Sequence, residues 1–160
     1  MTKRDRELMV EGVLKRWRKL QEEVWAAEQD AANIAFSQGS GEPVQSSSIS
    51  DKTARGAFVL ESIADKKAWV DCVTEAMAWL EHEQPDLQRL LYGHYGMYHT
   101  RGYKRGQARA FADSYCKVYH IAMSEYHNRR IDALDEVVLT ATEHGLLHSS
   151  NEQRKAVVIS

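Results

Sequence analysis

Two interleaved series of apolar residues near the N-terminus constrain the fold more than any other feature. The first series is Val10, Trp17, Val24 and Ala31, and the second is Val13, Leu20, Ala27 and Ile34. Each series repeats every seven residues and the two are offset by three, which is the a/d pattern of a coiled-coil seam. We therefore expect one long helix over residues 1–36. Its seam could pack on its own domain, form a helical hairpin or hold a homodimer together.

Helical signals also dominate the remainder of the chain. The stretch "SQGSGEPVQSSSIS", residues 37–50, is rich in Gly and Ser and predicts a flexible loop. A helix is expected to start at Ser50 or Asp51, a second is expected to be capped by Asp65, and a third to begin at Pro85. No alternating strand pattern persists anywhere. The sequence therefore predicts an all-α fold with a helical domain over residues 51–147 and a loose tail over 148–160.

Composition and motifs bound the class of protein. The chain has 160 residues and is 43% hydrophobic, which is enough for one core, and it has no apolar run long enough to span a membrane. The N-terminus lacks a signal-peptide pattern, so we expect a cytoplasmic protein associated with the nucleoid. The seven histidines and the two cysteines, Cys72 and Cys116, lack the spacing of a metal site, and no phosphate-binding loop or nucleophile motif occurs. We therefore expect no metal, no cofactor and no enzymatic activity.

Charge is distributed unevenly along the chain. The net charge is −2, yet residues 101–130 contain seven Lys or Arg against two acidic residues, a local charge of +5. One basic segment in an otherwise acidic protein favours a localised contact with a polyanion.

The basic segment leads into two predicted helices joined by a short connection. The first helix ends near Tyr119, and the second starts with Ser124 as its cap and ends before Gly145. Spacings of three and four place Ile131, Leu134, Val138 and Ala141 on a buried face. Two helices joined in this way, over residues 106–145, are typical of a helix-turn-helix that presents its second helix to the major groove of double-stranded DNA.

Helical phase and charge then predict which side chains contact DNA. The candidate base contacts are the residues at the start of the second helix, Glu125, Tyr126, Asn128 and Arg129. Arginine and asparagine can bond bidentately to guanine and adenine edges. The candidate phosphate contacts are Arg101, Lys104, Arg105, Arg109, Ser124 and Arg130.

Three segments resemble a known family of regulators. They are "KKAWVDCVTEAMAWL", "DLQRLLYGHY" and "VYHIAMSEYHNRRIDALDEVVLTATEHGLL". Together they resemble phage late-gene transcription regulators of the RinA/ArpU type, whose C-terminal module is similar to region 4 of bacterial sigma factors. The chain is also similar to small phage antiterminators of the Q type. These resemblances imply a phage or prophage transcription regulator that binds DNA and acts with RNA polymerase as an activator or antiterminator. The alternative is a helical phage assembly or packaging protein that oligomerises through residues 1–36.

Overall fold

The computed structural model confirms an all-α fold. It describes the backbone of residues 1–38, 46–98 and 102–147, together with their side chains except those of 36–38 and 46–52. Seven helices and no strand occur in these ranges. None of the described helices is long and apolar enough to cross a membrane. The predicted tail, residues 148–160, lies outside the described residues.

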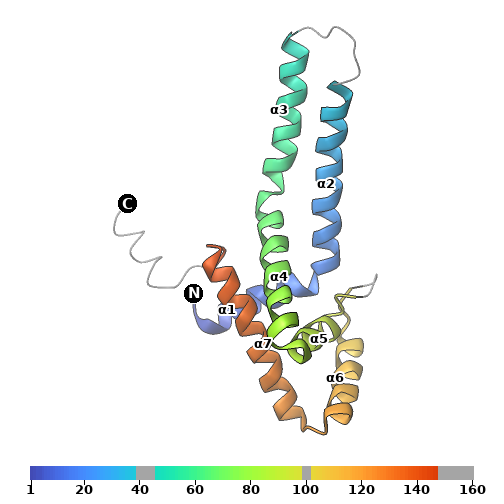
Figure 1. Ribbon diagram of the computed structural model, residues 1–160, viewed down its shortest axis with the longest axis vertical. Coiled ribbons are helices and arrows are strands. Elements are labelled where there is room, and N and C mark those ends of the chain that lie inside the picture. The colour runs from blue at the N-terminus through green and yellow to red at the C-terminus, as the bar shows by residue number, and fades with distance from the viewer. Residues whose placement is uncertain (39–45, 99–101, 148–160) are drawn as a thin grey trace, which may run out of the picture.

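The N-terminal heptad segment forms two helices instead of one. Helix α1 (Lys3–Lys15) starts with a capping box in which the Thr2 hydroxyl accepts from the Asp5 amide and the Asp5 carboxylate accepts from the Thr2 amide. It ends at Arg16, and α2 (Trp17–Gln38) leaves at a steep angle (Figure 1). This break divides the seam: Val10 and Val13 pack into the main core with Trp17, while the later seam positions face α3 and α4.

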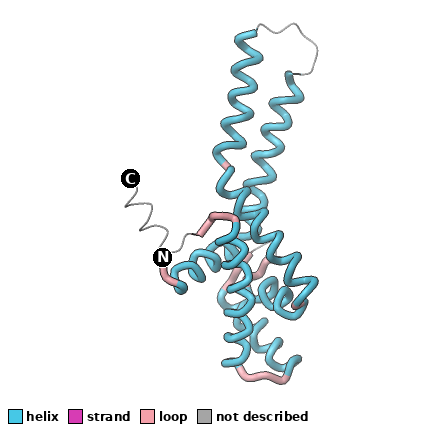
Figure 2. The backbone as a smooth tube through the Cα atoms, turned by 60° about the vertical axis from the view of Figure 1, so that its left-hand side comes forward, coloured by secondary structure: helices cyan, strands magenta, loops and turns pink. Residues whose placement is uncertain are grey.

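Helices α2 and α3 (Ser46–Ser62) form a hairpin that projects from the rest of the molecule, as two views agree (Figures 1 and 2). The hairpin interpretation of the seam is therefore the one that the structure supports. The predicted loop over 37–50 is wrong at its end, because the serines from Ser46 onward already belong to α3. Serine is a favoured residue at helix starts as well as in loops, so its composition alone could not place this boundary.

The main core lies where α1, α4, α5 and α7 meet. Helix α4 (Ala64–Glu83) follows α3 after a break at Ile63, and α5 (Pro85–His94) starts with Pro85 in its first turn, as predicted. Asp65 lies in the first turn of α4 but does not cap it, since Ile63 holds the cap position. The largest fully buried side chains of this core include Leu14, Leu80, Leu91 and Leu134.

A second, smaller core joins α5 to the last two helices. Helix α6 (Arg105–Tyr119) packs against α5 and α7 (Met123–Glu143) through Leu90, Ala112, Tyr115 and Tyr126. Helix α7 ends at Glu143, and the predicted glycine, Gly145, follows the cap residue His144. Gly145 has φ +75°, its amide bonds to the Thr142 carbonyl, and the next amide bonds to the Ala141 carbonyl. This pattern is a Schellman motif, which satisfies the last carbonyls of the helix.

Candidate nucleic-acid interface

The connection between α6 and α7 is three residues long and lies at the far end of the molecule from the α2–α3 hairpin (Figures 1 and 2). His120 ends α6 in the left-handed conformation, with φ 53°, and the Ile121 amide bonds back to the Cys116 carbonyl. Ala122 then holds the cap position of α7 without a side-chain hydrogen bond. The prediction that Ser124 caps this helix is wrong by two residues, and Ser124 is exposed on its first turn.

The buried face of α7 is centred differently from the prediction. Leu134 and Ala141 are buried as expected, whereas Ile131 and Val138 are only half-buried. The fully buried positions are Tyr126, Ala133, Leu134, Val137 and Ala141. This series extends the inward face toward the start of the helix, into the region predicted to contact DNA.

The sequence predicts that Tyr126 contacts a base, but this residue lies on the buried face of α7. Its side chain is fully buried, with its ring edge-on to Tyr115 and its hydroxyl 2.7 Å from His94 Nδ1. Burial, with a contribution from the positive charge of Arg130, lowers the pKa of His94 to about 4, so the ring is neutral and Nδ1 can accept from the hydroxyl. Tyr126 therefore ties α7 to α5, and the prediction that it contacts a base is corrected.

Arg130 is likewise committed inside the protein. Its Nη1 donates to Glu11 Oε1 at 2.6 Å and to the Tyr95 hydroxyl at 3.1 Å. The two charged side chains are only 16% and 11% exposed. A guanidinium that neutralises a buried carboxylate is not available to a phosphate, so the predicted phosphate contact at Arg130 is also corrected. Its role is to join α7 to α1.

Arg129 lies at the edge of the exposed face. Its Nη2 is 3.1 Å from Glu125 Oε1, its Nη1 is 3.4 Å from the Tyr115 hydroxyl, and its guanidinium lies over the Tyr119 ring. Glu125 and Asn128 are exposed. The start of α7 therefore presents a serine, a glutamate and an asparagine to solvent, with an arginine that a salt bridge on α7 and two tyrosines of α6 hold against the surface.

The predicted phosphate contacts on α6 remain available. Lys104 holds the cap position of this helix, Arg105 begins it, and both are exposed, as is Arg109 one turn later. None of the three forms an ion pair within the described part of the chain. Cations at a helix N-terminus are opposed by the helix dipole, so this cluster gains if it meets an anion. Arg101 falls outside the described residues.

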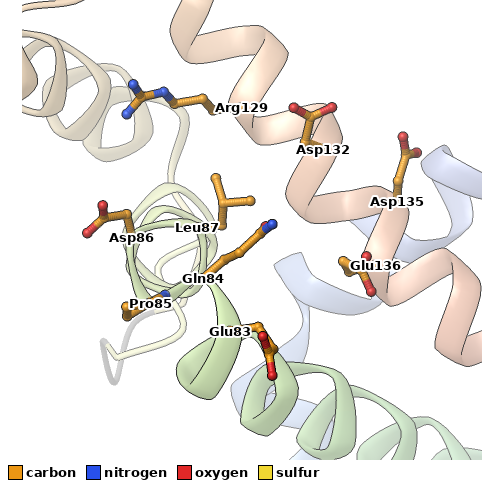
Figure 3. Close-up of a pocket in the computed structure, with 9 residues that line it drawn as sticks. All are labelled: Glu83, Gln84, Pro85, Asp86, Leu87, Arg129, Asp132, Asp135 and Glu136. Atoms are coloured by element: carbon orange, nitrogen blue, oxygen red, sulfur yellow. The ribbon is translucent and has the colours of Figure 1, made fainter.

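An acidic groove of about 690 Å³ borders this surface between α7 and the α4–α5 junction (Figure 3). It is lined by Glu83, Gln84, Pro85, Asp86, Leu87, Arg129, Asp132, Asp135 and Glu136. Burial and repulsion from Glu143 and Asp135 raise the pKa of Glu136, as expected where carboxylates gather. Phosphate groups would be repelled here, so on α7 only the first turns, ahead of the groove, suit contact with a polyanion.

Part of this groove has a signal in the sequence. Asp135 and Glu136 follow Asp132 by three and four residues on one helix, but their partners Glu83 and Asp86 come from a different segment. Lys117 is a further exposed cation on α6 that the predicted contacts omitted, although it belongs to the same basic segment. Comparison with protein-family models, with curated proteins and with solved structures finds no match for this chain.

Proposed function

We propose that this chain binds double-stranded DNA through α6, the turn and α7, and regulates transcription. The observation that carries the proposal is the group of exposed cations Lys104, Arg105 and Arg109, which have no ion-pair partner among the described residues and lie beside the exposed first turns of α7. Phosphate contacts supply most of the affinity of such a surface, and side chains at a helix start supply the discrimination between bases. The structural corrections leave Asn128 and Arg129 as the proposed base contacts with Glu125, and Ser124 as a phosphate contact.

Arg129 would exchange partners on binding. Its bond to Glu125 spans one helical turn at the surface, and such exposed pairs contribute less than about 1 kcal/mol. A bidentate contact with a guanine edge discriminates by about 1–3 kcal/mol, so the exchange favours the correct site. Glu125 would then repel phosphates at incorrect sites or accept a hydrogen bond from cytosine.

Selection from a random duplex library at moderate salt tests the proposal. The expected result is enrichment of one motif, and a library that enriches no sequence would contradict sequence-specific binding. With the enriched duplex in hand, Arg129→Ala should remove the preference over random DNA. Arg105→Ala should weaken all duplexes and lower the salt slope of binding by about one unit.

A matched control separates a local contact from net charge. Arg55→Ala on α3 removes the same charge from an exposed side chain of the hairpin, which lies at the far end of the molecule from the α6–α7 turn (Figures 1 and 2). It should leave both the affinity and the salt slope unchanged. An equal loss for Arg55→Ala and Arg105→Ala would mean that the affinity comes from overall charge, and that α6 is not the contact surface.

The resemblance to RinA/ArpU-type regulators and Q-type antiterminators suggests RNA polymerase as the partner and phage late genes as the target. Transcription in vitro on paired templates, one with the promoter alone and one with a downstream terminator, separates activation from antitermination. The alternative of a packaging subunit assembled through the heptad seam has less support, because α3, α4 and the main core cover that seam within one chain.

A further inference from the structure

Among its described side chains, the projecting hairpin has no buried core of its own. We define the arm as residues 25–35 of α2 and 53–62 of α3. On α2 the last buried side chain before the arm is Val24, and on the chain after the arm the first is Ile63. None of the arm side chains is buried. Two helices held by such contacts are marginal in water, since most helical stability comes from burying an apolar face. The arm therefore has apolar surface to give to a partner.

The arm carries an apolar groove between its two helices. The groove has a volume of about 290 Å³ and is lined mainly by small or aliphatic residues: Ala31, Ile34, Ala35, Thr53, Gly56, Ala57 and Leu60. Gly56 opens it, because a Cβ there would already touch the Ile34 side chain at 3.8 Å. An engineered apolar cavity of about 150 Å³ binds benzene, so a groove of this size suits a bicyclic aromatic ring.

The same arm also carries an exposed bicyclic ring. The Trp25 side chain is 65% exposed, although indoles usually bury most of their large apolar surface. It precedes Ala35 by ten residues on α2, which is about 15 Å along the helix axis. The arm therefore carries both an exposed indole and an apolar groove, at two fixed positions along its length.

We propose that the arm pairs two copies of this chain, with Trp25 of each copy seated in the groove of the other. A two-fold axis that passes midway between the two positions exchanges them, so that both contacts form together. This is the reciprocity of an isologous interface, in which residue i meets j and j meets i. The two arms would cross at an angle, because Trp25 and Ile34 are about two and a half turns apart and lie on different sides of α2. An unrelated partner would need a ring for the groove and a separate pocket for Trp25, whereas a second copy supplies both.

Charge and size are compatible with this pairing. Every residue that lines the groove is uncharged, and the acidic residue Glu28 beside it is already neutralised by Lys67 at 2.8 Å. The described length of α2 from residue 25 is about 21 Å, and two helices are about 20 Å wide, so each copy offers a face of about 400 Å². Two such faces bury about 800 Å² together, which is below the roughly 1,200 Å² of stable interfaces and in the range of transient ones. This size indicates a weak, reversible dimer with a dissociation constant on the order of tens of micromolar.

Sedimentation velocity over a wide range of protein concentration tests the proposal on the full chain. The wild-type protein should shift from monomer to dimer, and Trp25→Ala should weaken the dimer at least tenfold. Ala57→Phe should do the same by filling the groove, because Ala57 is exposed and lines it. Trp79→Ala is the matched control: this indole is 45% exposed but lies on α4, outside the arm, so the dimer should persist.

Far-ultraviolet circular dichroism of each variant shows that the helices are intact. A wild-type chain that stays monomeric at hundreds of micromolar would overturn the proposal, and the groove would then belong to another protein. A dimer that survives both Trp25→Ala and Ala57→Phe would also overturn it, since two copies would then meet elsewhere. The proposed dimer does not depend on DNA binding. A variant that loses dimerisation can still be tested for DNA binding, and a variant that loses DNA binding can still be tested for dimerisation.

Discussion

Replacement of Arg130 by Met tests whether this residue supports the fold or contacts DNA. The change leaves the Glu11 carboxylate and the Tyr95 hydroxyl without their common donor in a region where Glu11 is only 11% exposed. Removing one partner of a buried ion pair costs about 3–5 kcal/mol. Partial access of water to this pair favours the lower end, so we expect a loss of about 3 kcal/mol of unfolding free energy. A domain has only about 5–15 kcal/mol in total, so this loss is large.

A double-mutant cycle isolates the pair. Urea unfolding followed by circular dichroism should give a smaller loss for Arg130→Met combined with Glu11→Leu than for the sum of the two single variants. The Nε of Arg130 is buried without a hydrogen-bond partner in the structure, so the native pair is itself incompletely satisfied. Apolar replacement of both residues can therefore restore much of the stability.

The neighbouring arginine provides the control. Arg129→Met removes the same charge from the same helix, but its side chain is 30% exposed and its partner Glu125 is a surface residue. We expect it to cost less than about 1 kcal/mol. If Arg130→Met were as stable as wild type and weakened DNA binding instead, the arginine would be a phosphate contact, and the inward phase of α7 described above would be wrong.

Three further predictions concern α5, the residues it contacts, and a glycine of α1. The folded-state pKa of His94 is held at about 4 by burial and by Arg130, whereas the unfolded value is 6.5. Unfolding therefore takes up a proton, and stability should fall progressively from about pH 6.5 down to 4, with a smaller pH dependence for His94→Gln in urea melts. Gly93→Ala would place a Cβ inside the van der Waals radius of the Phe111 ring and should destabilise the protein by about 1–3 kcal/mol in thermal melts. Gly12→Ala, which meets no atom within 4 Å, should stabilise α1 by about 0.5–1 kcal/mol, and equal behaviour of the two glycines would contradict this packing.

The all-α class and most helices could be predicted because they depend on local signals. The spacing of Trp69, Cys72, Val73, Ala76 and Leu80 predicts one buried face of α4; the last four are buried, and Trp69 is half-buried at its edge. The glycine that ends α7 was found from its position after the last apolar residue. Such features involve residues within one or two helical turns, where periodicity and capping preferences act directly.

The phase of α7 could not be found in this way. Tyr126 and Arg130 are polar residues, so a sequence pattern places them on the surface. Tyr126 is buried because its hydroxyl meets His94, and Arg130 is buried because it pairs with Glu11, which lies 119 residues earlier in the chain. The same holds for the break at Arg16, where neither Pro nor Gly marks the end of α1 and packing against two different groups of helices divides the seam.

The two proposals together constrain how a dimer could meet DNA. The two-fold axis would cross α2 near residue 30, about 20 Å from its start at Trp17, so the two arm bases would lie at most about 40 Å apart. The α6–α7 turn lies at the opposite end of each protomer, which would place the two proposed DNA-binding surfaces still farther from one another (Figure 1). Half-sites one turn apart on a duplex are separated by only about 34 Å. An arm-paired dimer would therefore either bind half-sites more than one turn apart or bridge two separate duplexes, and a rigid connection between α7 and α1 through Arg130 would fix that separation.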